Sequence, residues 1–332
     1  MLEVDVTCSR GDFTLKFAAS VPGGSTLGVF GPSGSGKTTL IEAVAGLFTP
    51  VAGTVAVAGR QLFGGSAAVP VPPNHRRIGL VRQRAALFPH LTVDENIHYA
   101  AGADRARARH LVERFGLERL GARRPSSLSG GEAQRVAFVR VLAVPIDLLL
   151  LDEPLTGLDV ELRGELATTV REVVRELEIP CLVAAHELIE LERMVDTLAI
   201  LVGGRLLQVG EVSGIYAAPQ RVEVAENLGM QLLPARESAT GRELRLAIHP
   251  EAIRFGAGSG MALPVTVEGV RFLRGRYEHR LGYGGRSLVA YAGEPLPAGE
   301  AVARLVTPHL FDPDGWLAKL PPGGWQAIEV LP

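Results

Sequence analysis

The feature that most constrains the fold of this chain is a glycine-rich loop, Gly-Pro-Ser-Gly-Ser-Gly-Lys-Thr, at residues 31–38. It matches the pattern G-x-x-x-x-G-K-[ST] at every fixed position. Glycine is needed there because successive backbone N–H groups must point at phosphate oxygens, and a Cβ would obstruct that geometry. A strand is predicted at 26–30 and a helix at 38–45. We therefore predict a phosphate site at a helix N-terminus, with Lys37 on the β- and γ-phosphates and Thr38 as a Mg²⁺ ligand.

An acidic pair follows the apolar run at 148–151. The run predicts a buried parallel strand, because its apolar residues do not alternate with polar ones. In a doubly wound sheet, ligands bind at the carboxyl ends of strands. Asp152 can hold Mg²⁺ there through water, and Glu153 can polarise an attacking water as a general base. Alone, such a pair is typical of a solvated strand end, but the phosphate loop favours the catalytic interpretation.

The segment Leu-Ser-Gly-Gly-Glu at 128–132 lies between the phosphate loop and the acidic pair. With these motifs in this order, residues 1–228 resemble the nucleotide-binding subunits of ABC transporters, and the C-terminal part suggests the importer type. The resemblance implies an α/β fold of the P-loop NTPase class, an ABC cassette with a helical subdomain inserted at about 85–144. It also implies an ATPase whose cofactors are ATP and Mg²⁺.

Further family motifs have counterparts in this sequence. Gln83 matches the glutamine that contacts Mg²⁺ and the attacking water, and His186 matches the histidine that contacts the γ-phosphate. Asp159 stands in the loop that contacts the partner subunit. The implied catalytic residues are Glu153, His186 and Gln83; the implied metal ligands are Thr38, Gln83 and Asp152; and the implied ATP contacts are Gly31, Pro32, Ser33, Gly34, Ser35, Gly36, Lys37, Thr38, Thr39, Ser129, Gly130, Gly131, Glu132 and Asp159.

The serine and glycines of the 128–132 segment begin a predicted helix at 132–142, so they can form a second anion-binding helix terminus. The resemblance implies that this terminus faces the phosphate loop of a second copy, giving a head-to-tail homodimer with two ATP molecules. It also implies two transmembrane permease subunits and, indirectly, an extracytoplasmic solute-binding protein as partners. An ordinary helix N-cap with an acidic first turn is the alternative interpretation of the same residues.

The sequence departs from the family pattern in three places. Arg10 stands where an aromatic residue usually stacks on adenine, and the nearest aromatic is Phe13. Arg84 follows the matched glutamine where many members have an acidic residue, and Thr156-Gly157 replaces the more usual Ser-Ala. None of these changes removes a phosphate or metal ligand, so we still expect ATP hydrolysis.

Charge and composition exclude several classes of protein. The net charge of −2 gives no global attraction to nucleic acid or to an anionic membrane surface. The arginine-rich helix predicted at 104–115 lacks interleaved aromatics, so it predicts a solvated face and no nucleic-acid partner. No apolar run approaches the ~20 residues that cross a bilayer. Cys8 and Cys181 are far apart, which disfavours a disulfide framework and favours the cytoplasm. We expect a peripheral location on the cytoplasmic face of the inner membrane, held there by partners.

The chain is predicted to contain a nucleotide-binding domain at 1–229, a linker at 230–242 and a second domain at 243–332. Short strands predicted at 244–248, 264–272, 277–282, 287–291 and 301–307 indicate a small β-barrel. Residues 246–251 resemble the opening of the oligonucleotide-binding-like (OB-like) regulatory domain of many importer ATPases. The arginines of this domain can either sense an oxyanion or form a solvated face; they are Arg271, Arg274, Arg276 and Arg280.

The segments at 1–4, 72–79 and 87–90 are similar to molybdate importer ATPases, so molybdate or tungstate is the predicted solute. Importers of sulfate, ferric iron, polyamines and sugars share much of this pattern and remain alternatives. The segment 87–93 is predicted either to dock membrane subunits or to pack internally. Two other classes fit less well: a soluble ABC ATPase normally carries a coiled-coil insertion or a second cassette, and a non-enzymatic module would not need the hydrolytic groups.

Overall fold

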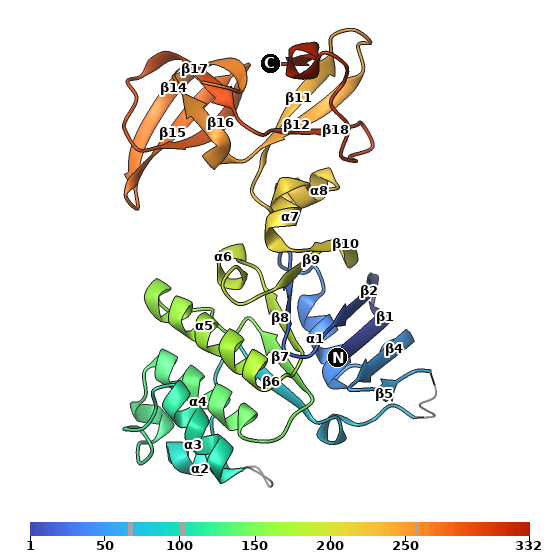
Figure 1. Ribbon diagram of the computed structural model, residues 1–332, viewed down its shortest axis with the longest axis vertical. Helices are drawn as coiled ribbons and strands as arrows, with labels where there is room; N and C mark the ends of the chain where they lie inside the picture. Colours follow the sequence, from blue (N-terminus) through green and yellow to red (C-terminus); the bar gives the residue numbers. More distant parts are fainter. Residues whose placement is uncertain (66–68, 100–103, 257) are drawn as a thin grey trace. The chain divides into compact units, whose positions relative to one another are not determined.

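The computed structural model describes residues 1–65, 69–99, 104–256 and 258–332 (Figure 1). The chain divides into two compact units, residues 1–212 and residues 213–332. The first unit combines a large sheet with helices, and the second is built mainly from strands. Among the described residues, no helix has both the length and the apolar content needed to cross a lipid bilayer.

The first unit is organised around a ten-stranded sheet with the order β5-β4-β1-β2-β10-β9-β3-β8-β7-β6. Pairing is parallel throughout the neighbouring strands β9, β3, β8, β7 and β6. The next pair, β9 with β10, is antiparallel. Three of these strands, β3, β7 and β8, are wholly or almost wholly buried, as expected for strands covered on both faces. The strands are β1 (Leu2–Arg10), β2 (Phe13–Val21), β3 (Thr26–Phe30), β4 (Ala52–Val57), β5 (Arg60–Phe63), β6 (Ile78–Arg82), β7 (Leu148–Asp152), β8 (Cys181–Ala185), β9 (Thr197–Val202) and β10 (Arg205–Gly210).

Among the described residues between β6 and β7, three α-helices are present, which confirms the predicted helical insertion. Figure 1 shows α2, α3 and α4 grouped at the end of this unit away from β1 and β4. Polar caps explain where they start: Thr92 and Asp104 accept hydrogen bonds from the first turns of α2 and α3. The helices of the unit are α1 (Lys37–Ala45), α2 (Val93–His98), α3 (Arg105–Arg114), α4 (Gly130–Leu142), α5 (Val160–Glu176) and α6 (Leu188–Leu191).

The second unit consists of two sheets that share one apolar core. One sheet has the order β18-β12-β11-β19 and the other β13-β17-β14-β15-β16. Buried side chains from both sheets form one cluster, consistent with the predicted OB-like domain. The elements are α7 (Val212–Ala217), α8 (Val222–Asn227), β11 (Gln231–Glu237), β12 (Glu243–Ile248), β13 (Ile253–Phe255), β14 (Met261–Leu273), β15 (Arg276–Tyr283), β16 (Arg286–Ala292), β17 (Gly299–Leu305), β18 (His309–Phe311) and β19 (Ile328–Val330).

The predicted linker at 230–242 is wrong, because β11 lies there and pairs with β12 and β19. Leu233 and Ala235 lie on the same face of β11 and are buried in the core of the second unit. Pro234 suggested a loop, yet it is not paired with β19, because the residues of β11 that pair with β19 begin at Ala235. Its missing N–H therefore interrupts no hydrogen bond to that strand. The boundary between the units also falls earlier than the predicted residue 229, after residue 212.

Candidate functional site

The phosphate loop connects β3 to α1, as predicted. Gly36 is the N-cap of α1 and has φ of 106°, and Gly34 has φ of 79°, so both occupy the left-handed region that favours glycine. A Cβ on Gly31 would collide with the carbonyl oxygen of Leu201 in β9. The loop is thus held against the neighbouring strand, and the unpaired N–H groups at the start of α1 form an anion-binding terminus.

Lys37 lies inside this loop and is 6% exposed. Its Nζ donates hydrogen bonds to the carbonyl oxygens of Gly31 and Pro32, at 2.8 and 3.0 Å. Burial lowers the pKa of Lys37, while the charges of Glu153 and Asp152 act in the opposite direction. The ammonium group is therefore held by neutral carbonyls within the loop, where an incoming phosphate would be a stronger partner.

The predicted metal ligands Thr38 and Asp152 come together although 114 residues separate them. The Thr38 hydroxyl donates to Asp152 Oδ1 at 3.3 Å. Burial raises the pKa of Asp152, whereas its hydrogen bond from Thr38 lowers it. A hydroxyl and a carboxylate are oxygen ligands of the kind that Mg²⁺ prefers. Gln83, the third predicted ligand, is exposed and directly follows Arg82, which pairs with Asp152 across β6 and β7.

Glu153 and His186 also meet, at the carboxyl ends of the adjacent strands β7 and β8. His186 Nδ1 lies 3.0 Å from Glu153 Oε1. Glu153 has φ of 50°, uncommon for a residue with a side chain, and its N–H donates to the carbonyl oxygen of Ala184 at 2.9 Å. The sequence predicted that both residues face the nucleotide, but their direct contact was not predicted. Together they form an acid–histidine pair beside the phosphate loop.

The signature segment caps α4. The Ser129 hydroxyl accepts a hydrogen bond from Glu132 N at 3.2 Å, and Glu132 Oε2 accepts one from Ser129 N at 2.7 Å. This backbone hydrogen bond is the main cause of the lowered pKa of Glu132. Ser129 and Gly130 are exposed, while Gly131 is buried where a Cβ would collide with Leu162. The alternative interpretation as an N-cap is therefore correct, and it leaves the first amides of α4 free to meet an anion.

Asp159 likewise caps a helix, because its carboxylate accepts a hydrogen bond from Leu162 N at 2.9 Å at the start of α5. Asp159 is exposed and so is the following Val160, of which 71% is accessible. The predicted dimer contact thus lies at an open helix terminus. An exposed apolar residue beside it is consistent with a surface that meets another protein.

Both residues considered for adenine stacking already have partners within the chain. Arg10 is paired with Glu42 at 2.5 Å, and its guanidinium lies 4.7 Å from the centre of the Phe48 ring. The Phe13 ring packs against Gly36, where a Cβ would lie 3.0 Å from Phe13 Cζ. Phe13 is therefore the aromatic residue that borders the phosphate loop.

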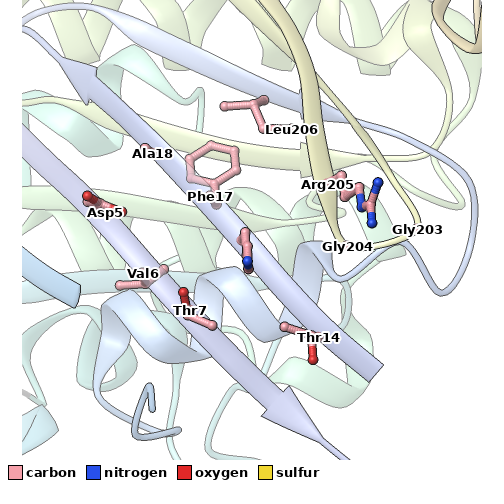
Figure 2. Close-up of a pocket in the computed structure, with 11 residues that line it drawn as sticks. Asp5, Val6, Thr7, Thr14, Phe17, Ala18, Gly203, Gly204, Arg205 and Leu206 are labelled. Atoms are coloured by element: carbon pink, nitrogen blue, oxygen red, sulfur yellow. The ribbon is translucent and has the colours of Figure 1, made fainter. Parts of the chain in front are cut away.

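A groove of about 820 Å³ lies on another face of the same unit (Figure 2). It is lined by Asp5 and Thr7 of β1, by Thr14 and Lys16 of β2, and by the turn between β9 and β10. These positions alternate along β1 and β2 with buried core residues, so the groove lies on the outer face of the sheet. It contains none of the residues predicted to bind ATP.

Two buried side chains that hydrogen-bond near the site were not among the predicted site residues. Arg76 is 2% exposed and donates to the carbonyl oxygens of Ala43 and Val44 in the last turn of α1 and to that of Val71. Gln134 is 4% exposed and bridges two strand ends. Gln134 lies in the extension of the signature segment at 133–135. Neither residue is assigned a role by the sequence alone, because their partners are backbone carbonyls brought near only by the fold.

Two of the four arginines predicted as a possible oxyanion sensor form ion pairs. Arg271 lies 2.9 Å from Glu278, and Arg276 lies 2.5 Å from Glu251 with its guanidinium 3.9 Å from the centre of the Tyr291 ring. Local acidic partners offset these charges, so the pairing favours a solvated surface over an oxyanion sensor.

Residues 16–156 match the ABC transporter family. The molybdenum import ATP-binding protein ModC of Paramagnetospirillum magneticum is 38% identical over 224 residues, which cover 66% of this chain and 61% of that protein, less than two thirds of its length. The molybdate/tungstate import ATP-binding protein WtpC of Archaeoglobus fulgidus is 39% identical over 62% of this chain and 85% of that protein. The Fe(3+) ions import ATP-binding protein FbpC 1 of Rhodococcus jostii is 41% identical over 69% of this chain and 67% of that protein.

Among solved structures, the chain is similar to cbiO1 from Clostridium perfringens, described as part of the ABC transporter complex cbiONQ. The TM-score is 0.59 with 25% sequence identity, covering 69% of this chain and 94% of that one. A structure described as the ATP binding subunit of an ABC transporter gives a TM-score of 0.55 with 27% identity, covering 64% and 91%.

Proposed function

This chain belongs to the family of ABC transporter ATP-binding subunits, and we propose that it hydrolyses ATP to power the import of a solute. One observation carries this proposal. The phosphate loop, the pair Thr38–Asp152 and the pair Glu153–His186 gather at the carboxyl ends of three neighbouring parallel strands. These groups suit phosphoryl transfer to water, a reaction catalysed mainly by positioning and by charge stabilisation.

The residues present fit ATP and Mg²⁺. The Ser35 hydroxyl is buried and has no hydrogen-bond partner within the described chain. A Cβ on Gly31 would collide with the Leu201 carbonyl oxygen, and Gly34 and Gly36 have positive φ values that favour glycine. The first amides of α1 and Lys37 would hold the β- and γ-phosphates. Thr38, Asp152 and Gln83 would hold Mg²⁺ directly or through water, and the bound ion would neutralise charge on the phosphates.

Glu153 is the proposed general base. His186 contacts Oε1 of its carboxylate at 3.0 Å, which orients the side chain and leaves Oε2 to accept a proton from water. The Glu153 backbone is fixed by its hydrogen bond to Ala184 in β8, so the carboxylate has a defined position at the end of β7. Gln83, just beyond the end of β6, is the proposed partner of the attacking water.

We propose that two copies form a head-to-tail dimer around two ATP molecules. The exposed start of α4 at Ser129 and Gly130 offers free amides to a phosphate. Asp159 and Val160 are exposed at the start of α5 and would contribute to the same interface. A Glu153→Gln variant should bind ATP and hydrolyse it slowly, so we expect it to accumulate in this dimeric state.

The proposed docking surface for two transmembrane permease subunits is the segment 87–93. The Asn96 side chain is fully buried and donates to the carbonyl oxygens of Phe88, Leu91 and Thr92, while its Oδ1 accepts from Phe88 N. The Phe88 ring lies 4.2 Å from that of Tyr99, which is 60% exposed. A rigid loop that presents aromatic side chains suits a protein interface. Through the permeases the chain would sit at the cytoplasmic face of the membrane and act with an extracytoplasmic solute-binding protein.

We propose molybdate or tungstate as the solute. Relatives named for molybdenum import and for molybdate/tungstate import support this choice, together with the similar segments at 1–4, 72–79 and 87–90. Ferric iron is the second candidate, because a relative named for Fe(3+) import is 41% identical. Uptake of radiolabelled molybdate, tungstate and ferric iron should be compared in cells with and without the gene. Loss of iron uptake alone would reject the oxyanion assignment.

ATP hydrolysis by the wild type and by Glu153→Gln tests the proposed function. We expect turnover to fall by about 100-fold or more in the variant, because general-base catalysis is worth at least that much. ATP should remain bound, and size-exclusion chromatography with ATP and Mg²⁺ should show a dimer. Equal turnover in the two proteins would refute the assigned base. Co-purification with membrane subunits would distinguish a transport ATPase from a soluble one.

A further inference from the structure

One buried amide contacts the backbone beside both Gln83 and Glu153. Gln134 Nε2 donates to the carbonyl oxygen of Pro154 at 2.9 Å and to that of Arg82 at 3.2 Å. Only 4% of Gln134 is exposed; its hydrogen bond to Pro154 is buried, and its hydrogen bond to Arg82 is partly buried. Losing the donor would leave both carbonyls without this partner, which is costly in a buried site.

The two carbonyls belong to functionally important strand ends. Arg82 ends β6 and immediately precedes Gln83, and Pro154 immediately follows Glu153. Gln134 itself lies in the second turn of α4, the helix that Ser129 caps. A single side chain therefore joins the signature helix to the ends of β6 and β7.

The restraint acts where the backbone needs one. Glu153 adopts φ of 50°, a conformation that costs about 1–3 kcal/mol in residues other than glycine and persists only where surrounding contacts enforce it. The hydrogen bond from Glu153 N to Ala184 supplies one such contact, and the bond from Gln134 to Pro154 supplies another on the following residue. Glutamine suits the position because its NH₂ group offers two donors without bringing a charge into a buried site.

We infer that Gln134 is a positioning residue that sets the signature helix against Gln83 and the Glu153 carboxylate, so that it controls turnover and not ATP affinity. This inference rests on the proposed ATPase function. The hydrogen bonds of Gln134 go to the carbonyl oxygens of Arg82 and Pro154, and neither residue belongs to the phosphate loop. Its removal would displace the catalytic carboxylate and leave the Lys37 site intact.

The test compares full-length wild type with Gln134→Leu. We expect kcat to fall by about 10- to 100-fold, since a displacement of about 1 Å in a catalytic group has an effect of this size. The Kd for ATP should stay within about twofold of the wild-type value, because the contacts of the phosphate loop with ATP are unchanged. In hydrogen–deuterium exchange without nucleotide, peptides covering 80–86 and 152–157 should exchange faster, whereas a peptide covering 31–45 should not.

A second variant, Gln134→Glu, keeps the shape of the side chain and serves if the leucine variant folds poorly. As a carboxylate it would face two carbonyl oxygens, so only its protonated form can donate a hydrogen bond. Burial raises the pKa of a carboxyl group, so the protonated fraction of the glutamate side chain increases as pH is lowered. The ratio of variant to wild-type kcat should therefore rise when pH is lowered from about 9 to about 6, a dependence that a general loss of packing does not produce.

Gln61→Leu is the matched control. Its Nε2 also donates to a backbone carbonyl, that of Phe63 at 2.7 Å, but in β5 at the far edge of the sheet. An unchanged kcat in Gln134→Leu, or faster exchange spread evenly over the first unit, would overturn the positioning role. A wild type without ATPase activity would instead refute the proposed function itself, so the two failures are distinguishable.

Discussion

Arg76 should stabilise the helix that carries the phosphate loop, and its replacement by methionine measures this contribution. The guanidinium donates to the carbonyl oxygens of Val44 at 2.7 Å, Ala43 at 3.2 Å and Val71 at 2.7 Å. Two of these carbonyls lie in the last turn of α1, where the helix supplies no i+4 N–H, although Ala43 O also accepts a hydrogen bond from Gly46 N at 3.2 Å. The positive charge at this terminus also interacts favourably with the helix dipole.

The expected magnitude follows from these contacts. Three hydrogen bonds would contribute about 1–1.5 kcal/mol each, or about 3–4.5 kcal/mol together. Burial disfavours the charged form and lowers the pKa of Arg76, so removing the guanidinium recovers part of a desolvation cost. We therefore expect Arg76→Met to lower the free energy of unfolding of the first unit by about 2–3 kcal/mol.

The neighbouring Arg77 provides the control, because it is 57% exposed and forms an ion pair with Asp147 at 3.2 Å. Arg77→Met should cost less than about 1 kcal/mol, as is usual for exposed ion pairs. Urea denaturation should be combined with hydrogen exchange at α1, since a chain of two units need not unfold in one step. Equal destabilisation by the two substitutions, or unchanged exchange at α1 in Arg76→Met, would refute the reasoning.

Three further predictions concern single groups. Burial alone would raise the pKa of Asp196, but hydrogen bonds from Thr26 N and two arginines lower it overall. The stabilising effect of Asp196 should therefore be complete above about pH 4 and disappear as pH falls further. Asp196→Asn should cost about 1–2 kcal/mol at neutral pH and less in acid denaturation curves, and a cost independent of pH would contradict this assignment. Lys37→Ala should weaken ATP binding by at least about tenfold in a fluorescent-nucleotide titration, and equal affinity would count against the phosphate-loop assignment. Cys8 and Cys181 are buried free thiols whose pKa burial raises, so a thiol reagent should modify them only after unfolding; rapid modification of the native protein would be inconsistent with that burial.

Local sequence patterns predicted the parts of the site that are contiguous in the chain. The loop at 31–38 combines glycines with a buried strand and a helix start, and all three elements form where predicted. The unbroken apolar runs before Asp152 and His186 form central parallel strands for the same reason. The linker at 230–242 was wrongly predicted because proline and glycine are common in loops, whereas burial in the second unit decided its strand.

Sequence alone determined which chemistry the chain can carry: a backbone cradle for phosphate, a hydroxyl and carboxylates for a metal ion, and a base for water. These properties depend on residue type and on neighbours within a few positions, so they can be recognised before folding. Tertiary structure decided the contacts between distant segments, including Thr38 with Asp152, Glu153 with His186, and Gln134 with the ends of β6 and β7. The physical reason is that parallel strands bring their carboxyl ends to one edge, and the buried donors that align them bind backbone carbonyls, which every residue possesses.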